Sequence, residues 1–211
     1  MLILKLSRCL LVVLLLPSEA RASSAKNFGE ALAIVQNPPR STMVPEFKLK
    51  YQYDLLTKTL KDVSGDIVEA GVWKGGSSAM MMFAELLARG TRNTSRTFWL
   101  YDTFEGLPPP NPLKDDIRAV QTWRVKIKKA SRKIAAQRNI DFNAVNQSTV
   151  NPMWDYGSLQ TVTKNVRDTG YPQGKIRFIK GKVENTLLQA SNIPEQIALL
   201  RLDTGAYMYN Y

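Results

Sequence analysis

The sequence predicts an α/β protein with a mostly parallel β-sheet and helices on both faces. Apolar segments of strand length alternate with helix-like segments from residue 46 onward. The apolar runs are continuous rather than alternating, which is typical of strands buried on both faces. The 211 residues are 44% hydrophobic, enough for a sizeable core. The sequence shows no internal repeat and no apolar run long enough for a multi-span membrane protein.

The elements follow from these runs in chain order. Strands are expected at 66–72, 96–102, 175–181 and 197–203, and helices at 46–62, 77–88, 159–168 and 183–189. The four prolines within 107–112 predict a loop, and 139–155 is polar and predicted to be loop. Residues 117–138 are strongly basic with some apolar content, so a helix or helix pair is expected there.

The first 22 residues have the layout of a secretory signal peptide. Lys5 and Arg8 precede an apolar stretch at 9–16, and Pro17 ends it before small residues that suit cleavage. The stretch is too short to span a bilayer, so we expect no transmembrane span after its removal. This places the protein in the secretory pathway or outside the cell; a misread N-terminus would instead mean a cytoplasmic protein. Residues 23–45 are expected to form an arm, and 46–211 a single domain.

Composition excludes several kinds of site. The chain has no histidine and one cysteine, which removes imidazole bases and cysteine–histidine zinc sites. A metal would have to be a hard cation held by carboxylates. The formal net charge of +11 fits either an anionic partner or a solvated basic surface, and both readings stay open.

A glycine-rich turn after the first strand is the first candidate site. It contains Glu69, Gly71, Gly75, Gly76 and Ser77. Glycines let a backbone approach a ligand closely, and the following helix start offers free N–H groups to a carboxylate or phosphate. The alternative is that these glycines serve only tight packing of helix on strand.

Acids end the second and fourth predicted strands. Asp102 is placed to accept hydrogen bonds from ribose hydroxyls, although it could equally be a turn or cap residue. Asp203 ends the fourth strand, and an acid there could hold Mg²⁺ or act as a base. Ligands of open α/β sheets bind outside the carboxyl ends of the strands, so Glu69, Asp102 and Asp203 are expected to line one edge.

Four motifs in order resemble those of the macrocin O-methyltransferase family. They are residues 65–77, residues 99–108, residues 178–187 and residues 197–207. The resemblance implies a Rossmann-like class I methyltransferase fold that uses S-adenosylmethionine. Family members methylate sugar hydroxyls of natural products and require Mg²⁺.

The resemblance also implies roles for individual residues. The turn from Glu69 to Ser77 would face the amino-acid end of the cofactor, and Asp102 would hold the ribose. Phe104 lies in the second motif and is expected beside the cofactor. The loop at Lys180 and Gly181 would lie near the adenine. The metal ligand would be Asp203.

The chain departs from the family at the catalytic residues. The position of the family's base is Gly205, so the catalytic residue is unknown. Asp203 alone is a poor magnesium site. The family fold has seven strands, and only about four are predicted here. We therefore expect the C-terminal strands to be missing, through an incomplete gene model, a truncated paralogue or a mis-spliced product.

Three functions stay open at this point. The first is an S-adenosylmethionine-dependent O-methyltransferase, or a fragment of one, acting on a sugar or small natural product. The second is a non-catalytic protein that keeps the cofactor pocket. The third is a basic module centred on 114–138 that binds anions or glycans, with nucleic acid disfavoured by the signal peptide. A homo-oligomer is compatible with each.

Overall fold

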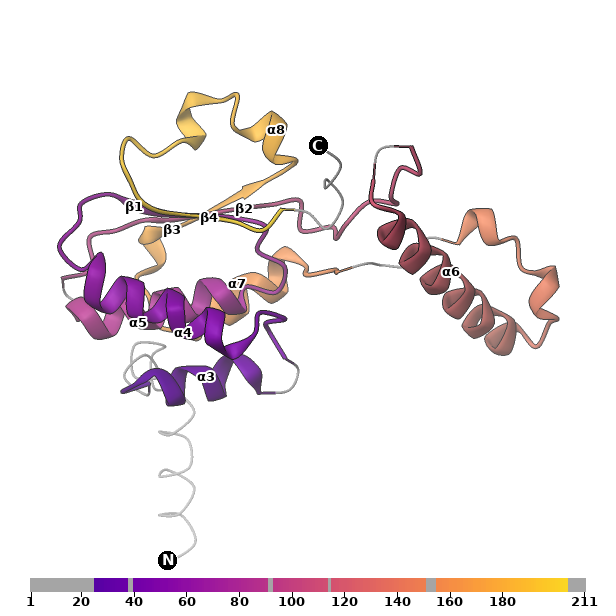
Figure 1. Cartoon of the computed structure of the whole chain (residues 1–211), viewed down its shortest axis with the longest axis horizontal. Helices are drawn as coiled ribbons and strands as arrows, with labels where there is room; N and C mark the ends of the chain where they lie inside the picture. Colours follow the sequence, from indigo (N-terminus) through magenta and orange to yellow (C-terminus); the bar gives the residue numbers. More distant parts are fainter. Residues whose placement is uncertain (1–24, 38–39, 91–92, 114, 151–154, 205–211) are drawn as a thin grey trace, which may run out of the picture. The chain divides into compact units, whose positions relative to one another are not determined.

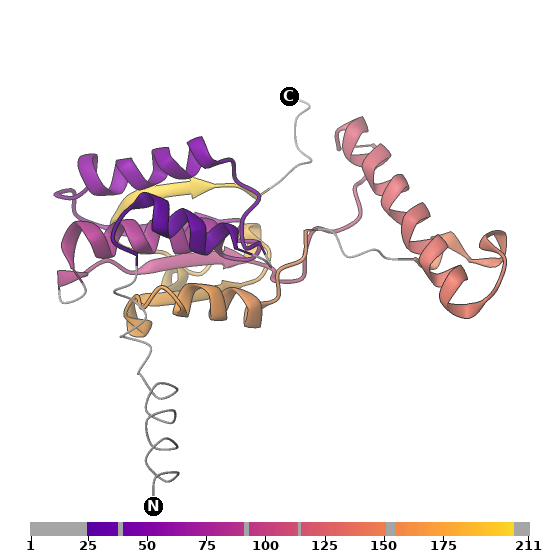
Figure 2. The same cartoon turned by 90° about the horizontal axis from the view of Figure 1, so that it is seen from below.

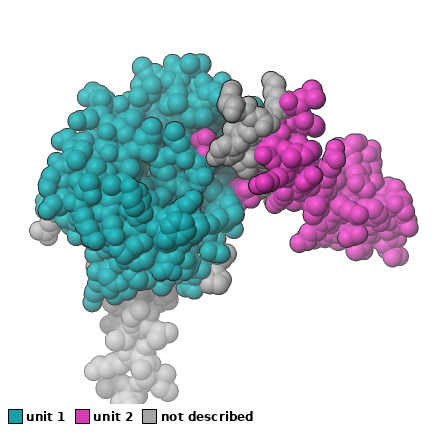
Figure 3. Space-filling view, in the orientation of Figure 1, with its two compact units in different colours: residues 1–104, 157–203 teal, residues 105–156, 204–211 magenta. Residues whose placement is uncertain are grey.

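The computed structural model describes residues 25–37, 40–90, 93–113, 115–150 and 155–204. The chain divides into two compact units, which are described separately below (Figure 3). Unit 1 comprises the chain up to residue 104 together with 157–203, and unit 2 comprises 105–156 and 204–211. The region expected to be one domain, 46–211, therefore contributes to two compact units. The predicted signal peptide lies outside the described residues.

Unit 1 is built on a four-stranded parallel sheet. Its strands are β1 (Asp66–Ala70), β2 (Phe98–Asp102), β3 (Ile176–Lys180) and β4 (Ile197–Leu202), in the order β3-β2-β1-β4. All four strands were predicted from their apolar runs. The order reverses at β1, because β2 and β3 follow on one side of it and β4 lies on the other. Such a reversal is where ligands bind in open α/β sheets.

Helices cover the two faces of this sheet unequally. They are α4 (Glu46–Asp54), α5 (Gly76–Arg89), α7 (Leu159–Arg167) and the short α8 (Val183–Thr186). Figure 1 shows α8 on the opposite face from the other three, and Figure 2, seen from below, shows α4, α5 and α7 side by side. The helix predicted over 46–62 is α4 followed by a π-helical turn, η1 (Leu55–Thr59).

The expected arm at 23–45 contains a packed helix, α3 (Phe28–Gln36). Asn27 caps it by accepting a hydrogen bond from the backbone N–H of Glu30 at 3.0 Å. Ala31 and Val35, one turn apart, are buried in a cluster that includes Met80 and Phe83 of α5. The segment is thus held by apolar burial, and the apolar residues within 28–35 are the sequence signal for this helix.

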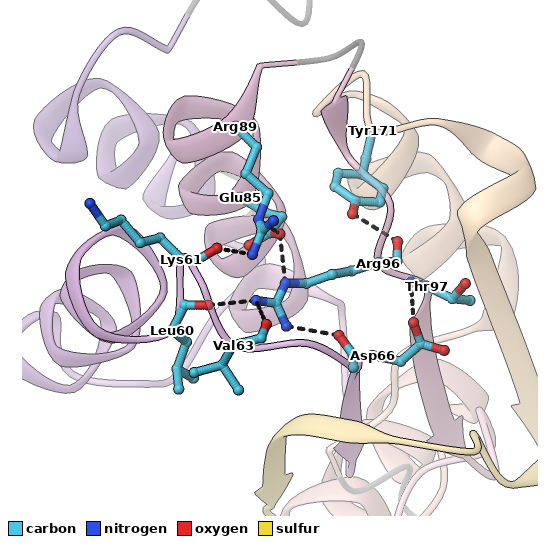
Figure 4. Close-up of polar contacts among 10 residues, drawn as sticks. Leu60, Lys61, Val63, Asp66, Glu85, Arg89, Arg96, Thr97 and Tyr171 are labelled. Atoms are coloured by element: carbon cyan, nitrogen blue, oxygen red, sulfur yellow. Dashed lines mark hydrogen bonds and ion pairs between the residues drawn. The ribbon is translucent and has the colours of Figure 1, made fainter.

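A buried arginine joins the loops at the amino ends of the strands (Figure 4). The side chain of Arg96 is 3% exposed, and its Nε lies 2.8 Å from Oε1 of Glu85, which is fully buried. Its two terminal nitrogens donate to the carbonyl oxygens of Leu60, Val63 and Gly65. One side chain therefore satisfies three loop carbonyls at the edge of the sheet opposite to the predicted site.

Unit 2 contains the long helix α6 (Ile117–Arg138), followed by two short 3₁₀ turns, η3 (Phe142–Ala144) and η4 (Gln147–Thr149). The basic segment is therefore one helix rather than a helix pair (Figure 2). Two further 3₁₀ turns, η5 (Gln173–Lys175) and η6 (Ala190–Asn192), belong to unit 1. Within the described ranges, no helix combines the length and the apolar character needed to cross a bilayer.

Candidate functional site

The carboxyl ends of β1, β2 and β4 meet at one edge of the sheet. The backbone N–H of Gly71 donates to Tyr101 O at 2.9 Å, and that of Asp203 donates to Ala70 O at 2.8 Å. Gly181, after β3, donates to Asp102 O at 3.0 Å. The structure thus brings Gly71, Asp102, Gly181 and Asp203 to a common edge, which was expected of the two aspartates from their positions at strand ends.

Glu69 differs from the other predicted residues because it lies within the sheet. Its side chain is fully buried and points toward α5, where the Ser78 hydroxyl donates to Oε2. Burial raises the pKa of its carboxyl above the ordinary value, and the Arg201 guanidinium opposes that rise. Glu69 therefore does not line the carboxyl edge; it is buried beneath that edge and bonded to residues of α5 and β4.

Arg201 is a site residue that sequence reasoning missed. It lies opposite Glu69 in the β1–β4 register, and its Nη1 is 2.8 Å from Oε1 of Glu69. Its Nη2 is 2.7 Å from Oδ2 of Asp203. The arginine thus links two of the predicted site acids. An arginine within an apolar strand was the available signal, but only the register identifies its partners.

The surroundings of Asp203 do not fit a magnesium site. Its side chain is 60% exposed and is ion-paired with Arg201. In the part of the chain that the structure describes, no group of three or more acidic, cysteine or histidine side chains gathers around a point. Mg²⁺ needs several oxygen ligands, which one exposed acid beside a guanidinium does not supply. Gly205, at the family's base position, lies outside the described residues.

The glycines that open α5 have a packing role. A Cβ on Gly75 would lie 3.1 Å from Cγ1 of Val162, and one on Gly76 would lie 2.4 Å from Ser41 O. The backbone N–H of Gly76 already donates to that carbonyl at 2.9 Å. At these two positions the structure therefore supports the alternative that the glycines serve tight packing.

The N-terminus of α5 also contacts other parts of unit 1 through its serine. Ser77 is buried, and its hydroxyl donates to Oε1 of Gln52 at 2.9 Å. This bond ties the start of α5 to α4. The predicted contact of Ser77 with a cofactor stays a prediction.

Asp102 holds the turn that follows β1. Its Oδ2 accepts hydrogen bonds from the backbone N–H groups of Val72 at 2.7 Å and Trp73 at 3.0 Å. Its Oδ1 accepts from Phe104 N–H at 2.9 Å, while the Thr103 hydroxyl is 3.5 Å away. The carboxylate that was predicted to hold a ribose therefore also fixes the backbone of two turns.

The remaining predicted cofactor residues fall into a buried and an exposed group. Phe104 is buried in the core and packs edge-to-face on Phe178, with ring centroids 6.3 Å apart. Lys180 is exposed at the end of β3, in register with Asp102. Gly181 has φ +143°, and a Cβ there would meet Thr186 Cγ2 at 2.9 Å. Of these, Lys180 and the backbone of Gly181 lie at the edge, whereas the Phe104 ring belongs to the core.

Trp73 carries a signal that the motif alone does not give. It lies in the turn between Gly71 and Gly75 with φ +52°, in the left-handed region. Its indole Nε1 is buried without a hydrogen-bond partner. A buried N–H without a partner is costly, and it fits a turn that a ligand or an ordered water completes.

A protein-family model that matches the sequence adds to the geometric evidence. The model described as Macrocin-O-methyltransferase (TylF) matches residues 18–132, more than half of the chain. The chain belongs to the macrocin O-methyltransferase family. The matched range includes the turn after β1 and the end of β2. Lys180 and Asp203 lie beyond it.

Individual relatives extend over more of the chain. Mycinamicin III 3''-O-methyltransferase of Micromonospora griseorubida is 27% identical over 194 residues, which cover 92% of this chain and 64% of the relative. The 8-demethyl-8-(2,3-dimethoxy-alpha-L-rhamnosyl)-tetracenomycin-C 4'-O-methyltransferase of Streptomyces olivaceus is 31% identical, covering 74% of this chain and 48% of the relative. The chain thus spans less than two thirds of the length of either relative.

A solved structure agrees on the fold. The O-methyltransferase NovP is similar with a TM-score of 0.50 and 26% identity, over 78% of this chain and 56% of that one. Together with the parallel sheet order, this similarity bears out the predicted Rossmann-like methyltransferase fold of the family.

Proposed function

We propose that this protein binds S-adenosylmethionine at the carboxyl edge of its sheet and serves O-methylation of a sugar or small natural product. The observation that carries the proposal is the joining of the β1 turn to the end of β2 through Asp102, within the range that the family model matches. The acceptor class follows from the relatives, whose names describe O-methyltransferases of glycosylated natural products.

The residues at this edge fit the cofactor. An ionised carboxylate has about four acceptor positions, and the backbone N–H groups of Val72, Trp73 and Phe104 use three of those of Asp102. The Thr103 hydroxyl is the weakest contact, and a ribose hydroxyl could replace it. Asp102 is therefore suited to one ribose hydroxyl rather than two. The indole N–H of Trp73 is a second group available to a ligand.

When bound, the cofactor supplies an electrophilic methyl group on a sulfonium. The protein's own contribution at this edge is binding and orientation: Asp102 fixes the turn, and Glu69 and Arg201 hold β1 against β4 behind it. Deprotonation of the acceptor hydroxyl is assigned to no described residue: Asp203 is ion-paired with Arg201 through Oδ2, and one exposed acid supplies too few oxygen ligands for Mg²⁺.

Calorimetric titration with S-adenosylmethionine tests the proposal. We expect Asp102→Asn to weaken binding by roughly tenfold to a hundredfold, because a hydrogen bond to a charged group contributes about 1.5–3 kcal/mol. Asp62→Asn is the matched control, since Asp62 is 86% exposed and lies in the loop before β1. Equal affinity in the Asp102 variant and the parent, measured well below the melting temperature, would contradict the ribose role.

A turnover assay distinguishes the O-methyltransferase from a non-catalytic protein that only binds the cofactor. Methyl transfer from labelled S-adenosylmethionine to mycinamicin III would support the enzyme. Cofactor binding without transfer to this or other glycosylated acceptors would favour the non-catalytic alternative.

We further propose that the protein enters the secretory pathway. The motif for N-glycosylation occurs at Asn93 and Asn146, and both asparagines are exposed. The test is N-terminal sequencing of the native protein, where a start at residue 21 or 23 is expected and a start at Met1 would contradict it.

A further inference from the structure

Helix α6 carries a one-sided positive charge that the methyltransferase site does not explain. Its 22 residues include eight Lys or Arg and no acid. Seven of the basic residues are exposed, and six of these form what we call the basic face: Arg118, Arg124, Lys128, Lys129, Arg132 and Lys133. Arg124, Lys128 and Arg132 follow one another at intervals of four, so they form a continuous row along the helix.

The opposite side of α6 is already used within unit 2. Ala119 and Trp123 are buried there in a cluster with Leu107 and Ile127. The helix is therefore not a free amphipathic helix that could insert its apolar side into a bilayer. What it presents to solvent is the basic face.

The acids that flank the helix in sequence accept hydrogen bonds from backbone N–H groups, and Asp115 does so from Asn111. Asp116 caps α6 by accepting the backbone N–H of Arg118 at 2.6 Å. Asp141 caps η3 by accepting that of Asn143 at 2.7 Å. No acid within α6 offsets the basic face, so its charge is available to an external anion.

Two exposed aliphatic side chains distinguish between anionic partners. Ile117 is 63% and Val125 is 67% exposed, and both interleave with the basic face by helical spacing. Val125 heads the row that continues through Lys129 and Lys133. Aliphatic side chains gain free energy by leaving water for the interfacial region of a bilayer, and they gain little against a nucleic-acid backbone. The aromatic side chain that could stack on a base, Trp123, is buried.

We propose that the basic face of α6 docks on a membrane surface rich in anionic lipid. The contact is peripheral: cations meet lipid phosphates and carboxylates while Ile117 and Val125 enter the headgroup region. Each basic residue near such a surface contributes about 1 kcal/mol, and the attraction falls off within a Debye length. The contact is therefore expected to be sensitive to salt.

Vesicle co-sedimentation of the full chain tests the proposal. Vesicles of phosphatidylcholine alone are compared with vesicles that also contain phosphatidylserine, at low and high salt. The neutral vesicles report any binding through the apolar stretch at 9–16, which carries no information on α6. We expect additional binding to the anionic vesicles that high salt abolishes.

Matched charge variants localise the contact. K128Q/K129Q/K133Q should weaken binding to anionic vesicles on the order of a hundredfold. The control K26Q/K48Q/K61Q removes the same charge from exposed lysines of unit 1 and should change binding little. Equal losses in both variants would overturn the proposal, because they would show a response to net charge alone.

The aliphatic residues separate lipid from nucleic acid. I117S/V125S leaves the charge unchanged and should weaken binding to anionic vesicles by about tenfold, since two exposed aliphatic side chains lose their burial. Binding of this variant equal to that of the parent would overturn the proposal. So would tight, salt-sensitive binding to duplex DNA without binding to anionic vesicles, which would assign the basic face to nucleic acid.

Discussion

Arg201 connects the two acids on which the edge of the sheet depends. Its guanidinium contacts buried Glu69 on one side and exposed Asp203 on the other. A buried carboxylate is costly unless it is paired, and here the partner comes from the neighbouring strand. The pairing of β1 with β4 and the charge state of Glu69 are therefore coupled.

The first prediction concerns the pH dependence contributed by Glu69. Its pKa is raised in the folded protein above the ordinary 4.5, chiefly by burial. The folded protein then binds this proton more tightly than the unfolded chain, so the contribution to stability is present below pH 4.5 and is lost as the pH rises through the folded-state pKa. We expect the free energy of unfolding of the parent, relative to Glu69→Gln, to fall over that range in urea titrations. A relative stability that rose with pH would contradict this sign.

The second prediction concerns the partner of Glu69. Arg201→Met should lower the free energy of unfolding by about 3–5 kcal/mol at neutral pH, because it leaves a buried carboxylate without its cation. The loss should shrink as the pH falls, since Glu69 can then take up a proton. In a Glu69→Gln background the loss of unfolding free energy caused by Arg201→Met should no longer vary with pH over the range in which Glu69 titrates. A pH-independent loss in the parent background would show that Arg201 acts through packing alone.

At the scale of elements, the start of α5 depends on a close approach between two backbones. The third prediction is that Gly76→Ala lowers the free energy of unfolding by about 1–3 kcal/mol, because its Cβ would lie 2.4 Å from Ser41 O. Gly174→Ala is the matched control, since no atom lies within 4 Å of a Cβ there. Thermal unfolding of the two variants compares them directly, and similar melting temperatures would mean that the segment at Ser41 yields easily.

The strands could be predicted from sequence because continuous apolar runs that end at a glycine or an acid have few other interpretations. The helix α3 also had a usable signal, because Ala31, Leu32 and Val35 recur at helical spacing, but the polar residues and the proline pair around it favoured an arm over the whole of 23–45. For the site, the edge residues Gly71, Asp102 and Asp203 were predictable from their positions at strand ends. Arg201 was not, because its role depends on register, and register is set by the pairing of strands distant in the chain.

At the scale of the whole molecule, the proposed binding residues and a buried stabilising ion pair lie at opposite ends of the strands in unit 1. Arg96 lies at the amino ends of the strands and satisfies Glu85 and three loop carbonyls. Of the predicted cofactor residues, Asp102, Lys180 and the backbone of Gly181 lie at the carboxyl ends.

The fourth prediction follows from this separation. Arg96→Met should lower the free energy of unfolding by about 3–5 kcal/mol, because buried Glu85 keeps only Arg89 as a cationic partner and the carbonyl oxygens of three loop residues lose their donor. Affinity for S-adenosylmethionine should be unchanged well below the melting temperature. Chemical unfolding and calorimetry measure the two quantities, and a parallel loss of affinity would contradict the separation of the two edges.

The fifth prediction concerns the outer strand. In the described part of the chain, β4 is hydrogen-bonded only to β1, and Leu200 and Leu202 are 51% and 69% exposed on one face. An edge strand with exposed apolar side chains favours pairing with another chain. The 211-residue chain should therefore self-associate with concentration in sedimentation velocity, and Leu202→Lys should reduce this. Leu113→Lys, at a leucine that is 94% exposed in unit 2, is the control and should not.

The bonds from Asp102 to the turn after β1 also make that turn observable by hydrogen exchange. Amide protons in exposed turns normally exchange with solvent deuterium quickly, whereas those of Val72 and Trp73 are held by one carboxylate oxygen. Their protection therefore reports the integrity of Asp102 in solution, without any ligand or turnover. A compound that displaced these two amides from the carboxylate would be detected as faster exchange at two adjacent positions, whereas a ligand that replaced only the Thr103 hydroxyl would leave their exchange unchanged.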